Sequence, residues 1–235
     1  KLRYVPITGD DGLLDLAKLD SLLTPEVKLF AMVHISNALG TVNPVAELCA
    51  HARRLGVTTL VDGAQSAGHL PVDVQAIGCD FYAFSGHKIC GPSGIGALYG
   101  RKEVLENTPP WHGGGEMITT VDYFKSTWNT LPHKLEAGTP DLSGPVGLHA
   151  ALDYLDALGR ENIFRHDLDL AAYAYQRLGE LKGVRLFGPK GERGGLVSFL
   201  LDDVHAIMTS NRPLQESGKL LSDVPTAGAI LDRFL

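Results

Sequence analysis

The sequence predicts an α/β fold in which a mostly parallel sheet is flanked by helices, followed by part of a small α/β C-terminal domain. Between residues 29 and 61 a strand-like run, a stretch with helical spacing and a second strand-like run follow one another. Strand, helix and strand within so short a stretch form a βαβ unit, whose strands are parallel and whose crossover is right-handed. Two further strand-like runs, at residues 81–84 and 95–99, extend the sheet.

The first βαβ unit rests on clear patterns. Residues 29–35 are almost continuously apolar, as expected of a strand that is covered on both faces. The helix follows Pro44 and ends at Gly56, and the strand at 57–61 is β-branched. The helix has one apolar face, formed by residues 45, 48, 49, 52 and 55.

The second half of the chain carries weaker patterns. Residues 111–140 are rich in Gly, Pro and Thr, and we expect an ordered loop there because their aromatic side chains argue against a disordered linker. After this loop we predict helices at 146–158 and 163–181 and strands at 184–187 and 195–201. The predicted domains are a large domain over 1–150, the start of a small C-terminal domain over 151–206 and an atypical tail over 207–235.

Composition excludes several classes of protein. A formal net charge of −6 gives no reason to expect nucleic acid as a partner. No apolar run approaches the roughly 20 residues that span a bilayer, and the first residues lack the apolar core of a signal peptide. The three cysteines are odd in number and lack zinc-type pairing, which favours a reduced, cytoplasmic setting. Because the chain begins at Lys1, we expect it to be a piece of a longer protein.

Polar side chains follow three of the predicted strands. Asn37 comes just beyond the first strand, Asp62 directly after the second, and Ser85, His87 and Lys88 directly after the third. Ligands bind beyond the carboxyl ends of the strands in open α/β sheets, so we expect these residues to face one crevice. The turn after Lys88 is rich in Gly and Pro, and such a turn can hold a catalytic lysine in a fixed geometry.

These residue types suit the chemistry of pyridoxal 5'-phosphate (PLP). Lys88 can form a Schiff base with the cofactor and later move a proton. Asp62 can keep the pyridine nitrogen protonated, which lets the ring accept electrons from the substrate Cα. Ser85 and His87 can bind the phosphate, and Gln65 can donate to the ring hydroxyl oxygen. The sequence therefore predicts a PLP enzyme that works on an amino acid.

Each of these residues alone also has an ordinary structural explanation. An aspartate after a strand is often a loop or helix-capping residue, and a lysine in a loop is commonly solvated. His34 lies inside an apolar strand and fits a hydrogen-bonded core histidine better than a ligand. The combination at three strand ends is what favours a cofactor site.

Five motifs then resemble a known family, the Suf-type (group II) cysteine desulfurases, which are class V, fold-type I PLP enzymes. The resemblance covers about residues 1–206 and implies removal of sulfur from L-cysteine, giving L-alanine and an enzyme persulfide for iron–sulfur cluster assembly. Selenocysteine lyases, which act on L-selenocysteine, are similar. The motifs are Ser85-Gly-His-Lys-Ile-Cys-Gly-Pro-Ser-Gly-Ile-Gly96, Val61-Asp-Gly-Ala-Gln65, His34-Ile-Ser-Asn-Ala-Leu-Gly-Thr-Val-Asn-Pro44, Gly113-Gly-Gly-Glu-Met-Ile118 and Glu136-Ala-Gly-Thr-Pro140.

The resemblance implies roles for the site residues. Lys88 would be the Schiff-base lysine and Asp62 the partner of the pyridine nitrogen, with Asn37 beside cofactor and substrate. Thr139 would bind the phosphate of the neighbouring subunit, because these enzymes are homodimers that share their sites. A Suf-type sulfur-acceptor protein is the implied partner. Gln65 would lie near the ring oxygen, and Ser85 and His87 would bind the phosphate.

The sequence also departs from this family at both ends. The amino-terminal third is absent, and residues 207–235 lack the nucleophilic cysteine and the substrate-binding arginine of the family's carboxy-terminal part. A frameshift after Ala206 would explain that tail. Cys49, Cys79 and Cys90 are poor replacements, because the first belongs to a buried helix face and the last to the turn that fixes Lys88.

Two other interpretations stay open. The first is another class V enzyme, such as an aminotransferase or a kynureninase-like hydrolase, which shares the logic of Asp62 and Lys88. The second is a non-catalytic fragment that acts only as a binding or dimerising module, which the missing ends favour.

Overall fold

A four-stranded mixed sheet forms the centre of the molecule in the computed structural model, which describes residues 1–201. Its strands lie in the order β3 (Leu29–Val33), β4 (Thr58–Asp62), β5 (Phe81–Ser85) and β6 (Gly96–Gly100). The first three are parallel and β6 is antiparallel to β5. The predicted α/β class is confirmed. The predicted tail at 207–235, with its proposed frameshift, lies outside the described residues.

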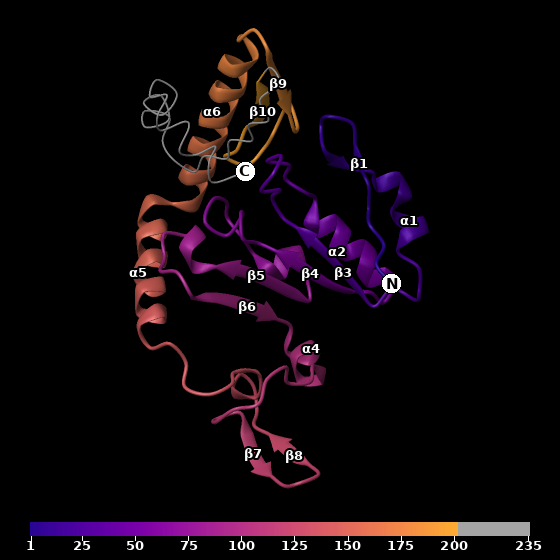
Figure 1. Ribbon diagram of the computed structural model, residues 1–235, viewed down its shortest axis with the longest axis vertical. Coiled ribbons are helices and arrows are strands. Elements are labelled where there is room, and N and C mark those ends of the chain that lie inside the picture. Colours follow the sequence, from indigo (N-terminus) through magenta and orange to yellow (C-terminus); the bar gives the residue numbers. More distant parts are fainter. Residues whose placement is uncertain (202–235) are drawn as a thin grey trace.

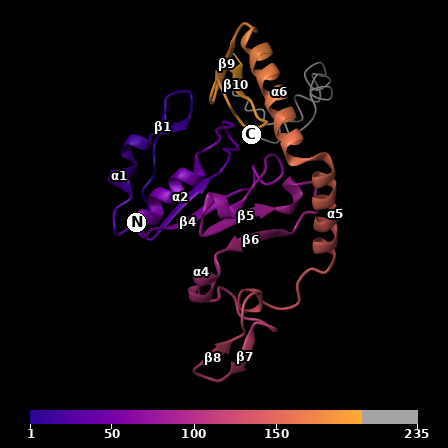
Figure 2. The ribbon, with the colours of Figure 1, turned by 180° about the vertical axis from the view of Figure 1, so that it is seen from behind.

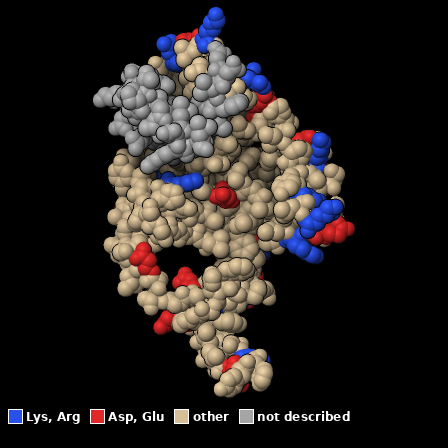
Figure 3. All heavy atoms as spheres, in the orientation of Figure 1, with Lys and Arg blue, Asp and Glu red and all other residues tan. Residues whose placement is uncertain are grey.

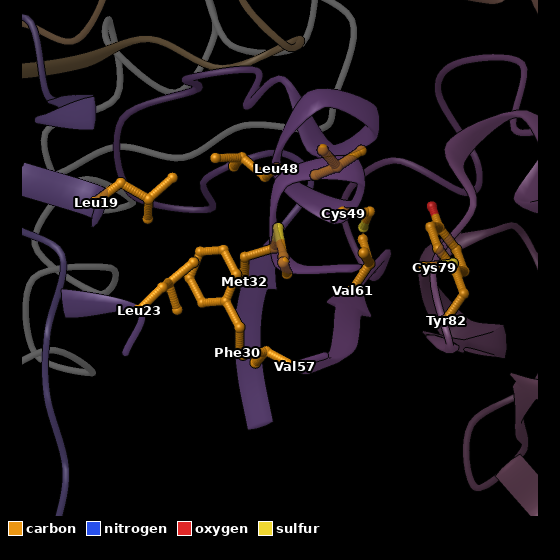
Figure 4. Close-up of a cluster of buried hydrophobic side chains, with 12 residues drawn as sticks. Leu19, Leu23, Phe30, Met32, Leu48, Cys49, Val57, Val61, Cys79 and Tyr82 are labelled. Carbon is orange, nitrogen blue, oxygen red and sulfur yellow. The ribbon is translucent and has the colours of Figure 1, made fainter. Parts of the chain in front are cut away.

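Helix α2 (Val45–Arg54) makes the predicted crossover between β3 and β4. Its apolar face is buried at Val45, Leu48, Cys49 and Ala52 as expected, whereas Leu55, also predicted for this face, is exposed. Gly56, just after the helix, has a φ of 69° that favours glycine. Figure 4 shows α2 side chains packed above those of the sheet. The core consists of Leu19, Leu23, Phe30, Met32, Val45, Leu48, Cys49, Ala52, Val57, Val61, Cys79 and Tyr82.

The expectation that the first strand is covered on both faces is wrong for the described part of the chain. Phe30 and Met32 are buried, whereas Leu29, Ala31 and Val33 are exposed. The alternation arises because α2 and the segment around α1 (Leu19–Leu22) pack on one face only. β3 is also an edge strand, since no described strand pairs with its outer side.

The segment at 111–140 contains more regular structure than the expected loop. It forms an antiparallel hairpin of β7 (Ile118–Val121) and β8 (Ser126–Trp128), followed by a 3-10 helix, η3 (His133–Leu135). Both ribbon views show this hairpin projecting from the end of the molecule opposite to the C-terminal unit (Figures 1 and 2). These strands were not predicted because they are short and rich in threonine, which fits a loop as well as a strand.

The C-terminal unit consists of α6 (Arg160–Gly179) and the antiparallel pair β9 (Val184–Phe187) and β10 (Ser198–Leu201). It is joined to the sheet by α5 (Ser143–Leu158), which runs without a break across residue 150. The domain boundary at 150/151 therefore stays a prediction. Within residues 1–201 no helix combines the length and apolarity that crossing a bilayer requires.

The remaining elements are short. They connect the longer ones and were not predicted individually, because none reaches two full turns or a complete alternation. They are β1 (Ile7–Thr8), β2 (Leu13–Leu14), η1 (Leu16–Lys18), α3 (Val74–Ile77), η2 (Gly86–Lys88) and α4 (Lys102–Asn107).

Candidate active site

The carboxyl ends of three neighbouring parallel strands meet at one edge of the sheet. Val33 at the end of β3 pairs with Asp62 at the end of β4, and Asp62 pairs with Ala83 of β5. Ser85 is the last residue of β5 and continues into η2, which contains Lys88. The structure therefore brings together the strand ends that the sequence singled out. The exposed Asn37 lies in the turn that follows β3.

The turn after Asp62 is held closely against the sheet. Asp62 Oδ1 accepts a hydrogen bond of 2.9 Å from the Ala64 amide, and the Gly63 amide donates to the Ala83 carbonyl at 2.8 Å. Gly63 lies directly on the ring of Tyr82, where a Cβ atom would be 2.1 Å from the nearest ring atom. Only glycine fits at this position, so the Asp62 carboxyl group is positioned by backbone packing rather than by an ion pair.

A buried polar cluster lies beneath this turn. The Tyr82 hydroxyl is 2.7 Å from Ser66 Oγ and 3.4 Å from His34 Nδ1. Burial lowers the pKa of His34 to about 4 and raises the pKa of Tyr82 to about 12. His34 is thus a core histidine with a hydrogen-bond partner, as predicted. Sequence reasoning missed Tyr82 and Ser66; the available signal was a tyrosine in an apolar strand, since a buried tyrosine hydroxyl needs a partner.

Lys88 lies in a turn whose backbone is fixed on both sides. The next residue, Ile89, is fully buried, and the carbonyl of Gly86 accepts the amides of Ile89 and Gly91 at 3.0 and 2.9 Å. On the other side Gly68 approaches so closely that a Cβ there would lie 2.9 Å from the Lys88 carbonyl oxygen. The turn after Asp62 therefore packs directly against the backbone of the lysine.

The other predicted site residues differ in burial and in the segments that surround them. Ser85 is half-buried and His87 is exposed, both next to Lys88. Gln65 is half-buried and lines a small cavity with Ser36 and His69. Thr139 is exposed, and its neighbour Gly138 donates to the Gly115 carbonyl at 3.0 Å. The segment that contains Thr139 is thus bonded to the triple-glycine loop rather than to the strand ends.

The cysteines occupy the positions expected of them. Cys49 is buried in α2 and Cys79 is buried before β5. Burial raises the pKa of both thiols, that of Cys79 to about 11, which disfavours the nucleophilic thiolate. Cys90 is exposed but has a φ of 63°, which holds it in the strained turn after Lys88. Among the described residues no three His, Cys, Asp or Glu side chains come together as metal ligands.

The donor set at the strand ends fits a pyridoxal phosphate group. None of the ion pairs within residues 1–201 involves Lys88 or Asp62. The amine is thus free to bond an aldehyde, and the carboxylate is free to accept from a protonated ring nitrogen. Ser85 and His87, in the same segment as Lys88, add a hydroxyl group and an imidazole as donors. In Figure 3 the central face of the molecule is largely uncharged, whereas most charges gather toward the β1–α1 side and the α6–β9 tip.

The chain is similar to known proteins in sequence and in structure. Residues 1–220 match the family model described as Aminotransferase class-V. The chain is 52% identical over 207 residues to a cysteine desulfurase of Haloferax volcanii, which covers 88% of this chain and 48% of that protein.

Two solved structures are also similar to the chain. The cysteine desulfurase CsdA of Escherichia coli superposes with a TM-score of 0.79 at 39% identity, covering 86% of this chain and 50% of that one. A cysteine desulfurase of Thermococcus onnurineus superposes with a TM-score of 0.83 at 35% identity, covering 95% and 54%. The chain spans about half the length of the curated relatives it matches.

Proposed function

Because the chain belongs to the class-V aminotransferase family, we propose that it forms the cofactor-binding part of a PLP-dependent cysteine desulfurase. Lys88 is the residue that links the cofactor. The observation that carries this proposal is an amine fixed in a rigid turn beside a strand that ends in a carboxylate, neither of which forms an ion pair within residues 1–201. The similarity to the cysteine desulfurases of Haloferax volcanii and Escherichia coli supports the reaction type.

Each residue of the site has a distinct task in this proposal. When bound, PLP supplies an electron sink for the bonds at the substrate Cα. Lys88 holds the cofactor and moves a proton at that carbon. Asp62 keeps the proton on the pyridine nitrogen through its carboxylate oxygens. Gln65 donates to the ring hydroxyl oxygen.

The phosphate and the substrate are bound by the surrounding residues. Ser85 and His87 donate to the phosphate from their places beside Lys88. Asn37 extends from the neighbouring turn toward cofactor and substrate. The substrate is L-cysteine or L-selenocysteine, which both present a polarisable atom on Cβ.

Lys88→Ala tests the central assignment. We expect the purified chain with added PLP to show the visible absorbance band of a lysine-linked cofactor, and we expect the variant to lose it. Borohydride reduction and peptide mapping of the unmodified chain should place the cofactor on Lys88. The matched control is Lys190→Ala, an exposed lysine, which should keep the band. A cofactor mapped to another lysine would remove the assignment.

Product analysis separates the reaction types. Because none of the chain's cysteines is the carrier in this proposal, the assay contains an added thiol to take the sulfur. A desulfurase then consumes L-cysteine and yields L-alanine and sulfide, while the thiol is oxidised to its disulfide. Amino-group transfer to pyruvate would instead indicate an aminotransferase of the same family. A chain that binds no PLP would favour the non-catalytic interpretation.

None of the three cysteines is the sulfur carrier in this proposal. Cys49 and Cys79 are buried with raised pKa values, and Cys90 belongs to the turn that fixes Lys88. A carrier must reach over the substrate sulfur and then leave with it. Because the sequence contains only these three cysteines, we propose that a cysteine not present in it accepts the sulfur and passes it to a Suf-type acceptor protein for iron–sulfur cluster assembly. Cys49, Cys79 and Cys90 are all free thiols, which supports a cytoplasmic setting.

The β7–β8 hairpin supports the homodimer. Tyr123 and Phe124 at its tip are 97% and 99% exposed, and Val121 beside them is also exposed. Clustered apolar side chains on a projecting element are typical of a surface that a partner covers. We propose that a second copy of the chain covers this hairpin, and that Thr139 reaches the phosphate bound by the partner.

A further inference from the structure

Helix α6 is bonded to the turn that follows β4, although the two are far apart in the sequence. His69 Nδ1 and Asp167 Oδ2 are 2.7 Å apart and separated by 98 residues. Arg160 at the start of α6 donates to the Ala67 carbonyl at 2.7 Å, two residues away from His69. Both His69 and Asp167 side chains are less than one quarter exposed, 24% and 21%. A charge-assisted hydrogen bond that is shielded in this way is stronger than one on the open surface.

The turn held by this bond is the one that carries Gln65. At its beginning it is anchored to β4 at Asp62 and to the buried Tyr82 hydroxyl through Ser66. At its end it is anchored to α6 through His69. Gln65 lies between Asp62 and Ser66, and the turn continues to His69, whose amide donates to the Ser66 carbonyl at 3.0 Å. Gln65 and His69 also line one small cavity. A displacement of His69 therefore reaches Gln65 through the backbone of Ser66.

Part of the lining of that cavity comes from the C-terminal unit. Gly195 and Leu196 line it, and a Cβ on Gly195 would lie 3.2 Å from Asp167 Cγ. The Gly194 amide donates to the Gly40 carbonyl at 2.8 Å, within the loop that contains Asn37. The unit that holds Asp167 thus contacts both loops that were predicted to reach the cofactor.

We propose that His69 is a positioning residue for the cofactor site: hydrogen-bonded to Asp167 of α6, it fixes the turn from which Gln65 contacts the cofactor ring. This inference rests on the proposed function, since Gln65 has its task only when PLP is bound. His69 itself does not touch the cofactor. Its effect passes through the backbone of the turn to the Gln65 amide.

The test uses the PLP-loaded chain and the position of its visible absorbance band. His69→Leu removes the bond to Asp167, and we expect the band to shift in the same direction as in Gln65→Leu. The double variant should shift no further than Gln65→Leu alone. The PLP dissociation constant of His69→Leu should rise about tenfold, as expected when the displaced Gln65 amide loses its hydrogen bond to the ring oxygen. His69→Asn should restore the unmodified band, because its amide nitrogen occupies the place of Nδ1.

The exposed pair of His149 and Asp153 on α5 supplies the matched control. Its atoms are 3.6 Å apart and both side chains are at least 70% exposed, so His149→Leu should leave band and affinity unchanged. If His69→Leu fails to fold, Asp167→Ala removes the same bond from the other side and should give the same shift. A stable His69→Leu or Asp167→Ala chain with the unmodified band would overturn the inference. If the unmodified chain itself forms no lysine-linked band, the proposed function fails first.

Discussion

At the scale of single residues, Gly63 shapes the site by having no side chain. It lets the turn after Asp62 lie flat on the ring of Tyr82, which is itself held by Ser66 and His34. The sequence showed the aspartate and the glycine but could not show the tyrosine beneath them, because the partners of a buried hydroxyl come from other strands. The polar residues at the strand ends could be predicted from the sequence, but the buried side chains that pack beneath them could not.

Gly63→Ala should therefore displace the turn. Its new methyl group would lie about 2 Å from ring atoms of a buried, hydrogen-bonded tyrosine, so the turn has to move. Overpacking of this kind destabilises by about 1–3 kcal/mol, and we expect at least a tenfold weaker affinity for PLP. Denaturant unfolding and PLP titration measure the two effects. Gly191→Ala, where nothing lies within 4 Å of the new Cβ, is the control. Unchanged PLP affinity in Gly63→Ala would contradict the described packing.

His34 gives the chain a pH-dependent stability. Burial lowers its folded-state pKa to about 4, below the unfolded value of 6.5, so the unfolded state binds the proton first. The stability is complete above about pH 6.5 and is lost as pH falls toward 4. This residue alone accounts for a loss of about 3 kcal/mol in the free energy of unfolding.

We expect His34→Gln to have a shallower dependence of unfolding free energy on pH between 6.5 and 4. Urea unfolding of both chains at several pH values measures it, and their difference removes the contribution of all other groups. Equal slopes for the two chains would contradict this expectation, because they would show that His34 has the same pKa in the folded and the unfolded state.

At the scale of secondary structure, an element could be predicted when its pattern of apolar residues extends over several turns or alternations. Helix α2 shows three turns of regular spacing and was predicted to within a residue. The hairpin was missed because β7 and β8 are short, and their threonines fit a loop as well as a strand. Helix α6 begins at Arg160 rather than 163, because its first turn is polar and carries no apolar spacing. The antiparallel direction of β6 is set by the turn that joins it to β5, and the spacing of apolar residues does not reveal it.

The hairpin makes a prediction about assembly. Replacing both Tyr123 and Phe124 by Ser removes two fully exposed aromatic groups from its tip. If a second copy covers them, the dimer dissociation constant should rise by tenfold or more, as expected for lost aromatic contacts at an interface. Sedimentation equilibrium measures the change. Tyr173→Ser, an exposed aromatic on α6, should leave assembly as it was. An unchanged dimer in the hairpin variant would place the interface elsewhere.

A buried arginine shows how the C-terminal unit is packed. Arg193 is only 2% exposed, and its guanidinium lies 3.9 Å from the centroid of the Tyr175 ring on α6. Burial lowers the pKa of this side chain. Stacking on an aromatic ring partly compensates such a cation. Arg193 thus joins the segment before β10 to α6, the helix that contacts the site through Asp167.

At the scale of the whole molecule, the site is assembled from segments that are distant in the sequence. The sheet places Asp62 at the end of β4 and Lys88 just beyond the end of the neighbouring strand β5, which the βαβ pattern made predictable. The bond between His69 and Asp167 was not predictable, because no local pattern relates a turn residue to a helix 98 positions away. Local sequence patterns therefore predicted the residues at the centre of the site, but not the long-range contacts that hold them in place.

The uncovered side of β3 affects how the isolated chain will behave in solution. Its outer backbone amides and carbonyls pair with no described strand, and Leu29 and Val33 stand beside them unshielded. Such a border can recruit any extended peptide by β-augmentation, including a misfolded copy of the same chain. We therefore expect self-association of the purified chain to begin at this border of the sheet, whose Val33 end adjoins the strand ends of the proposed site.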